Sequence, residues 1–283
     1  MADSYALKKI KALDPEKDHW EIAGLSAFYE FPWDNNRALE LALFRTFAVP
    51  TISSILDRTK QFENKTQKRY DDTDLILSEI LENGIESERA KAAIAKMNFI
   101  HSHFKISADD YLYVLSTFVF EPERWINKYG YRKLTENELK ASFKVWQELG
   151  ALMGIKNIPA TKGELEQFNI EYERKNFIPV PSNHAVALST ENLFLSWFLP
   201  KPMYGIGRPF LHAVMDEPLL TAVGFTKPNW FIQKSVDTSM ALRRIVIGWL
   251  PKRTTPVLRT KLPRKDSYPK GYEVRDLGSH KYK

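Results

Sequence analysis

One histidine lies in the apolar face of the helix that the sequence predicts over residues 87–104. The apolar positions there follow the spacing of a single helical face, and His101 falls among them. His103 points about 200° away around the same helix. Ala90 and Ala93, on the His101 side, leave room for a flat group to approach. Two interpretations are open: a ligand-binding histidine, or a core histidine bonded to a backbone carbonyl, which the pattern alone favours.

A cation and a hydroxyl form the second group of candidate residues. Arg69 and Thr73 are one helical turn apart and line up with the apolar residues Ile76 and Ile80. A cation and a hydroxyl at the edge of an apolar stripe suit a pocket for an anionic or oxygen-bearing group. The alternative is an ordinary helix start with a surface arginine, because the neighbouring aspartates favour a helix N-terminus.

Several motifs that would specify a particular catalytic, metal or nucleotide site are absent from the sequence. The chain has no cysteine, which excludes disulfides, thiolate nucleophiles, zinc fingers and iron–sulfur clusters. Glu16–His19 is the only Glu-x-x-His, so the paired motif of a di-iron bundle is missing. The glycines of residues 205–210 lack the third glycine and the preceding strand of a dinucleotide fingerprint. Hydrolase, Rossmann dehydrogenase and kinase interpretations are therefore disfavoured.

The elements that must position these residues are predicted to be helical nearly throughout. Capping boxes begin at Thr135 and Thr161, and alternating strand patterns are absent. Trp197, Phe210, Trp230 and Phe231, in the region after residue 179, are predicted to be packing residues. The predicted helices cover residues 37–47, 51–60, 71–81, 87–104, 109–120 (ending before Pro122), 135–150, 161–175, 190–198, 209–215, 218–223 and 230–250.

These elements fit one large all-α domain, which we place at residues 1–250. The remaining residues, 251–283, form a basic tail with ten Lys or Arg and three Asp or Glu, so the chain's net charge of +6 comes from the tail. A nucleic-acid-binding domain would carry its charge across a folded face, so no nucleic-acid partner is expected. Four prolines make the tail an extended strap or a solvated arm. Such a tail could also make a peripheral contact with an anionic membrane surface.

The sequence carries no evident targeting or membrane segment. Residues 1–17 lack the apolar region of a secretory signal. No apolar run approaches the roughly 18 residues needed to span a bilayer. As given, the chain is expected to be soluble.

Several strings, in their order along the chain, resemble the mpaB-type, ER-bound oxygenases of fungi. Each string is short, but their order and spacing together are specific, and the likeness covers roughly residues 8–250. The strings are residues 37–47 (RALELALFRTF) with 49–53 (VPTIS), 68–73 (KRYDDT), 97–103 (MNFIHSH), 120–126 (FEPERWI), 150–159 (GALMGIKNIP) and 241–244 (ALRR).

That family shares its catalytic domain with the bacterial latex-clearing (rubber) oxygenases. The resemblance implies an all-α fold that encloses a pocket for haem b, and O₂-dependent cleavage or oxidation of a C=C bond in an isoprenoid, hydrophobic substrate. His101 matches the family's proximal iron ligand, which makes it the expected metal ligand. Arg69 and Thr73 match its Arg-x-x-x-Thr pair and are the expected cofactor-binding and catalytic residues. His103, His184 and His212 are weaker candidates for a sixth iron ligand.

The chain departs from the family pattern in two places. Rubber oxygenases have a glutamate about four turns before the arginine, whereas this chain has Ser53 and Ser54 there, with Asp57 and Glu63 as the nearest carboxylates. The mpaB proteins also carry an N-terminal membrane anchor that is not seen here. The chain is therefore expected to be a cytoplasmic relative, or an ER-associated one whose anchor lies outside this sequence.

Two other functions are consistent with the same residues. A haem enzyme could carry out a peroxygenase-like or dehydrogenating oxidation of a small hydrophobic metabolite instead of cleavage. A helical lipid-binding protein without turnover, with its basic tail at membranes, would need no haem. These functions predict different outcomes when haem binding and product formation are measured.

Overall fold

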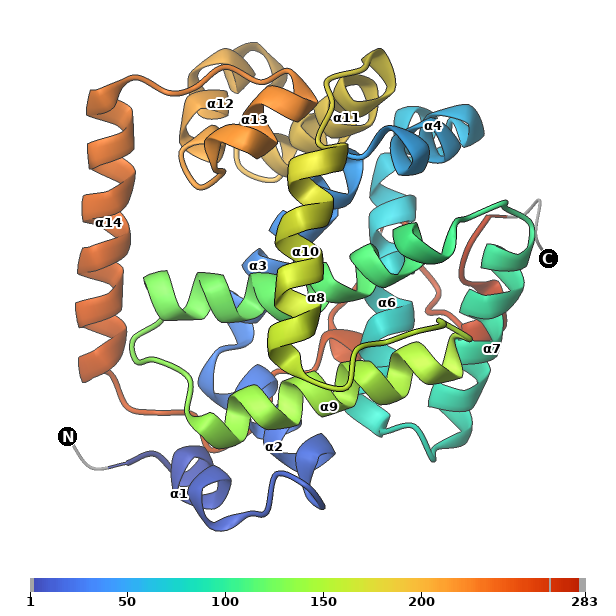
Figure 1. Cartoon of the computed structure of the whole chain (residues 1–283). Helices are drawn as coiled ribbons and strands as arrows, with labels where there is room; N and C mark the ends of the chain where they lie inside the picture. The colour runs from blue at the N-terminus through green and yellow to red at the C-terminus, as the bar shows by residue number, and fades with distance from the viewer. Residues whose placement is uncertain (1–2, 265, 280–283) are drawn as a thin grey trace.

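Fourteen α-helices, one π-helical turn and three 3-10 turns make up the described part of this computed structural model, residues 3–264 and 266–279 (Figure 1). Within those residues there is no β-strand, only an isolated bridge between Pro269 and Gly271. The prediction of a single helical domain is confirmed, whereas the boundary at residue 250 stays a prediction.

The helices, in chain order, are α1 (Tyr5–Ala12), α2 (His19–Leu25), α3 (Pro32–Phe47), α4 (Pro50–Thr59), α5 (Gln61–Asn64), α6 (Thr66–Asn83), α7 (Glu88–Ser102), α8 (Ala108–Tyr129), α9 (Glu136–Leu152), α10 (Lys162–Asn176), α11 (Pro181–Ser196), α12 (Tyr204–His212), α13 (Glu217–Val223) and α14 (Trp230–Trp249). The π-helical turn η1 covers Ser26–Glu30, and the 3-10 turns are η2 (Lys201–Met203), η3 (Arg259–Lys261) and η4 (Val274–Asp276).

Helix α8 crosses the middle of the molecule and organises the packing (Figure 1). It contacts α3, α9 and α10, while α6 and α7 pack against each other to one side. The largest hydrophobic cluster joins α6, α7, α8 and α9, with Leu75, Ile80, Leu115 and Leu149 among its buried members. The two predicted capping boxes are present at the starts of α9 and α10.

The predicted end of α8 is wrong. The helix does not stop before Pro122 but continues through it to Tyr129. A proline inside a helix costs about 3 kcal/mol. Phe120, Trp125 and Ile126 are buried on either side of it, and burying each such side chain contributes roughly 1.5–3 kcal/mol. Packing against α3 therefore outweighs the local preference.

Several further helix starts differ from prediction. Helices α3 and α6 each begin five residues earlier than expected. Helix α11 begins at Pro181, nine residues earlier than expected, because a proline is favourable at the first helical position. Helix α12 begins at Tyr204, so Pro209 lies inside it instead of at its start. Its Gly207 lies so close to α11 that a Cβ there would be 2.7 Å from Leu195 Cδ2, so a glycine permits this close packing.

The region after residue 179 is less buried than predicted. Trp197 packs on Tyr70 and Phe194, as expected. Phe210, Trp230 and Phe231, in contrast, are exposed. Their prediction as packing residues is wrong. Trp230 and Phe231 lie on α14, and too few elements pack around this helix to cover them.

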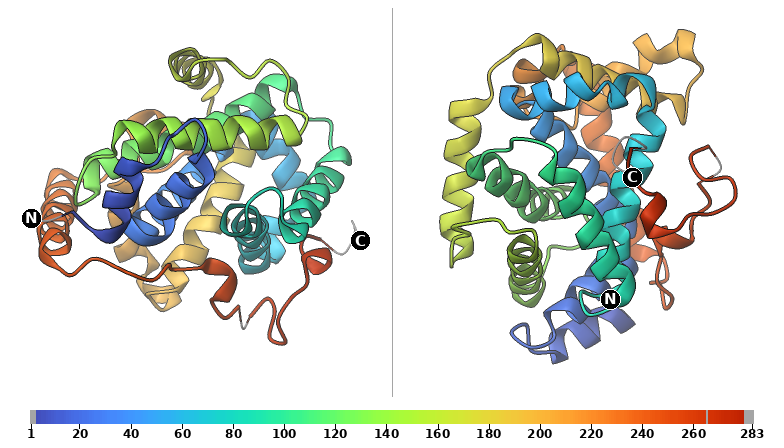
Figure 2. Two further views of the ribbon diagram at one scale, coloured as in Figure 1. Left: turned by 90° about the horizontal axis from the view of Figure 1, so that it is seen from below. Right: turned by 90° about the vertical axis from the view of Figure 1, so that its right-hand side faces the viewer.

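The basic tail folds back along α6 and α7 (Figure 2). Arg259 Nε lies 2.5 Å from Asp74 Oδ1, and Arg264 pairs with both Asp71 and Asp74. At the far end, Gly278 packs on α7, with its carbonyl accepting a hydrogen bond of 3.1 Å from Lys68 Nζ. Two of the tail's ten basic residues, Arg259 and Arg264, therefore neutralise aspartates of α6.

A helix that spans a bilayer must be both long enough and apolar enough to cross its hydrocarbon core. Among residues 3–264 and 266–279, no helix is both long and apolar enough alone. Helices α3 and α4 meet the length and composition requirements only as a pair, and they are bent by 97° at their junction.

Candidate functional site

A cavity of about 250 Å³ lies between α4, α6, α7, α8 and α9. Its volume approaches the lower end of the range for small-molecule sites, and its lining is largely apolar, as in most such sites. Arg69, Thr73 and His101 all border it, so the fold brings together the three residues singled out from the sequence. The apolar lining includes Phe47, Ile52, Phe62, Ile76, Met97, Phe104, Val114, Leu115, Phe118, Trp146 and Leu149.

Helix α7 carries His101 into this cavity. Ser87 caps the start of the helix by accepting a hydrogen bond from the backbone N–H of Ala90, and Ala90, Ala93 and Met97 form its buried face. That face orients the last turn, where the imidazole of His101 meets the ring of Tyr111 edge-on at 5.6 Å.

The imidazole of His101 has an unused polar atom. Its Nδ1 is buried and has no hydrogen-bond partner among the described residues. Burial, and secondarily the charge of Arg69, lower the pKa of His101 to about 4, so the ring is neutral at physiological pH. The backbone-carbonyl partner of an ordinary core histidine is thus not seen at Nδ1. A buried polar atom without a partner calls for an explanation such as a bound ligand.

Arg69 is a half-buried cation that faces the same cavity. Its Nη1 donates a hydrogen bond to Thr73 Oγ1, and its guanidinium lies 5.3 Å from the centre of the Phe62 ring. Within the described residues it forms no ion pair with a carboxylate. Burial lowers the pKa of Arg69 from its ordinary value, an effect that the charge of Asp72 opposes. An enclosed cation without a carboxylate partner is well placed to bind an anionic group.

Thr73 links this cation to the helix backbone. Its hydroxyl donates to the carbonyl of Arg69, 3.1 Å away, while it accepts the guanidinium hydrogen bond. The hydroxyl therefore holds the arginine side chain against α6.

Two buried carboxylates also border the cavity, and the sequence analysis did not single them out. Asp72 accepts a hydrogen bond of 2.8 Å from Lys68 and another from Tyr268. Asp110 accepts hydrogen bonds from Thr51 and Tyr172. Asp110 lies in the first turn of α8, where acidic residues are common, and Asp72 follows Lys68 by one turn of α6, a common pairing on helix surfaces. Only the three-dimensional contacts therefore distinguish them.

The serine at the position of the family's glutamate is not at the cavity. Ser53 is buried and donates a hydrogen bond of 2.6 Å to Asn183 Oδ1. It therefore fixes the packing of α4 on α11 and leaves Asp72 and Asp110 as the acidic residues of the cavity.

The three weaker histidine candidates do not line the cavity. His103 Nδ1 lies 2.8 Å from the carbonyl of Phe99, and His184 Nδ1 lies 3.0 Å from that of Val223. His212 is buried against Glu191, with 2.6 Å between Nε2 and Oε1. The fold thus places His101 alone, of these four histidines, at the cavity.

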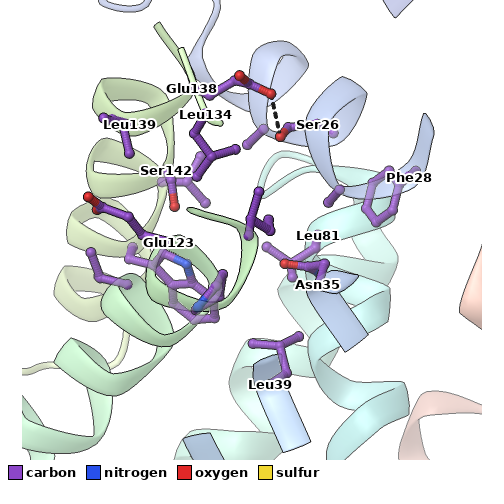
Figure 3. Close-up of a pocket in the computed structure, with 18 of the residues that line it drawn as sticks. Ser26, Phe28, Asn35, Leu39, Leu81, Glu123, Leu134, Glu138, Leu139 and Ser142 are labelled. Carbon is purple, nitrogen blue, oxygen red and sulfur yellow. Dashed lines mark hydrogen bonds between the residues drawn. The ribbon is translucent and has the colours of Figure 1, made fainter. Parts of the chain in front are cut away.

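A second, smaller cavity of about 70 Å³ lies between α2, α8 and α9 (Figure 3). Two of its polar contacts are internal: Ser26 donates to Glu138, 2.7 Å away, and Glu123 pairs with Lys162. A space of this size suits water and does not require a ligand. The cavity bordered by His101, Arg69 and Thr73 is therefore the candidate active site.

Comparison with known proteins assigns the class. Residues 37–264 match the family described as the catalytic domain of ER-bound oxygenase mpaB/B' and rubber oxygenase, so the chain belongs to this oxygenase family. It is 31% identical to ER-bound oxygenase mpaB' of Penicillium brevicompactum over 255 residues, 83% of this chain and 60% of the relative. It is 32% identical to ER-bound oxygenase mpaB of Penicillium roqueforti over 226 residues, 74% of this chain and 76% of that relative. The chain thus spans less than two thirds of the mpaB' relative's length.

A bare metal ion would need a group of several side-chain ligands at the site. In the described ranges, no three His, Asp or Glu side chains are grouped as ligands for one ion. A metal held by a cofactor needs only one or two protein ligands. A single histidine at the cavity is therefore compatible with a metal that is held by a cofactor.

Proposed function

We propose that this protein is a haem b-dependent oxygenase that uses O₂ to cleave or oxidise a C=C bond of an isoprenoid-type hydrophobic substrate. The observation that supports it most is the convergence of His101 and Arg69 on one apolar cavity in a member of the oxygenase family. Haem, when bound, supplies O₂ binding and redox chemistry that the side chains lack.

The residues at the cavity fit such a cofactor. His101 is neutral and has a buried ring nitrogen without a partner, which is the state in which a histidine binds iron. Arg69 is a half-buried cation without a carboxylate partner among the described residues, suited to a propionate group. The apolar walls suit the macrocycle and a hydrophobic substrate.

The chain's own residues would then have separate tasks. His101 would hold the iron from α7, and Arg69 would neutralise and orient an anionic or oxygen-bearing group. Thr73 would keep the guanidinium in place through the hydrogen bond described above. The aromatic walls would exclude water and align the alkene. Cleavage of the C=C bond by O₂ puts one oxygen atom on each carbon and yields two carbonyl groups, so no other oxidant is consumed.

This function is tested by supplying a linear isoprenoid alkene and ¹⁸O₂ to protein purified with haem. Two carbonyl products, each carrying one ¹⁸O atom before exchange with water, are expected. A single oxygenated or dehydrogenated product would indicate the alternative haem oxidations. Haem-free protein that binds the alkene without converting it would contradict the proposal and indicate a lipid-binding protein.

We also propose that the protein works at a membrane, as the names of its ER-bound relatives suggest. A water-insoluble isoprenoid substrate would be concentrated in the bilayer. Vesicle binding tests this proposal separately from haem binding and catalysis.

A further inference from the structure

Helix α14 has an exposed face that is apolar. At 100° per residue, Phe231, Leu242, Ile245 and Trp249 lie within about 60° of one another around the helix. Phe231 is 73% exposed and Trp249 is 76% exposed. A helix on the surface of a globular protein normally turns such a stripe towards the core. Here the exposed side chains show that the stripe faces out, and α14 lies at the side of the molecule (Figure 1).

The inner face of α14 fixes this orientation. Arg243 pairs with Asp34 at 2.9 Å and lies 3.8 Å from the centre of the Trp33 ring. Near the start of the helix, Gln233 donates a hydrogen bond to the carbonyl of Ala213. Met240 packs against the buried cluster that contains Trp125. Because these contacts hold the polar side of α14 inward, the apolar stripe is presented outward by the folded chain.

The charges around the stripe are positive. Residues 227–253 include six Lys or Arg and one acidic residue, Asp237. Lys234, Arg244 and Arg253 have no ion-pair partner among the described residues, and Asp237 accepts a hydrogen bond from Gln233. Lys234 lies about 20° outside the angular range of the stripe, next to Ile245, whereas Arg244 lies about 100° from Ile245, towards the inner side of the helix. The face therefore combines aromatic residues at both ends with an unpaired lysine at its edge.

From this juxtaposition we infer that the exposed face of α14 docks on an anionic phospholipid bilayer, with the helix lying flat in the interface. Aromatic side chains at both ends and cations along the helix are the features of interfacial helices. A second copy of the chain fits less well, because a symmetric contact would enclose the unpaired charge of Lys234 at the edge of the stripe, while the stripe itself offers no acidic residue to neutralise it. The inference rests on the proposed membrane association and is independent of haem.

The test is co-sedimentation of the full chain with phosphatidylcholine vesicles that contain or lack phosphatidylserine. The variant Phe231→Ser/Trp249→Ser removes two exposed side chains and leaves the inner contacts of α14 intact. Ile170→Ser/Ile178→Ser is the matched control, because both isoleucines are exposed elsewhere on the molecule. Lys261→Gln/Lys270→Gln/Arg275→Gln tests a contact through the tail. Circular dichroism verifies that each variant is folded.

We expect wild-type protein to bind vesicles with phosphatidylserine and to lose binding with added salt. The α14 variant should bind about tenfold or more weakly, and both other variants should bind normally. Loss of binding in the tail variant alone would overturn the inference while membrane association stands. A wild-type protein that binds no vesicle would overturn both, and concentration-dependent dimerisation abolished by the α14 variant would assign the face to a second copy.

Discussion

Arg69 donates a hydrogen bond to Thr73, one turn later on α6, and forms no ion pair within the described residues. This arrangement contrasts with Arg45, a more deeply buried cation that pairs with Glu121, Glu173 and Asp216. Arg45 is thus neutralised within the fold, whereas the charge of Arg69 remains available to a ligand in the cavity.

The contrast predicts opposite effects on stability for the same substitution. Arg45→Met leaves three carboxylates without their shared cation and should lower the free energy of unfolding by about 3 kcal/mol or more. Arg69→Met removes a half-buried charge that has no ion-pair partner among the described residues, and should change the free energy of unfolding by no more than about 1 kcal/mol, while oxygenation is lost. Urea unfolding and product formation measure the two quantities. An Arg69→Met protein destabilised as strongly as Arg45→Met would show that Arg69 serves the fold instead of the site.

The ion pairs between tail and α6 predict a structural role for the tail. Arg264→Gln removes contacts with Asp71 and Asp74 and should lower the free energy of unfolding by about 1–3 kcal/mol. Arg275→Gln is the matched control, because Arg275 is exposed in the same tail, and should have almost no effect. Thermal or urea unfolding compares the two variants. Equal stabilities would mean that the tail's ion pairs contribute nothing measurable.

The pH dependence of stability is predicted to involve Glu138. Burial raises the pKa of this carboxyl, but hydrogen bonds and charge from Arg132, with hydrogen bonds from Thr135 and Ser26, lower it below its ordinary value overall. A lowered folded-state pKa adds stability that is present above the unfolded-state pKa and is lost as the pH falls through the folded-state value. Glu138→Gln should therefore be less stable than wild type at pH 7, and the difference should shrink below about pH 4.5. A difference that is constant with pH would contradict this assignment.

The helices with strong local signals were predictable from the sequence. Ser87, Thr135 and Thr161 mark helix starts that the structure confirms, because a cap acts within a single turn. The continuation of α8 through Pro122 was not predictable in this way. It depends on burial against α3, a contact between segments distant in the sequence.

The site was predictable in part for the same reason. The helical face of His101 and the spacing of Arg69 and Thr73 are local patterns, and the fold brings the three to one cavity. Asp72 and Asp110 could not be singled out, since their partners Tyr268 and Tyr172 come from distant parts of the chain. The exposure of Trp230 and Phe231 was missed because aromatic residues in a helical pattern are usually buried.

The central claim is that His101 holds a haem iron in the cavity. The most direct measurement is the visible absorption spectrum of protein purified after haem supplementation, beside His101→Ala and the matched variant His103→Ala. We predict a Soret band in wild type and in His103→Ala that collapses in His101→Ala, because His103 is turned away from the cavity. A band of equal strength in all three proteins would exclude His101 as the ligand, and no band in any of them would contradict the haem-dependent function.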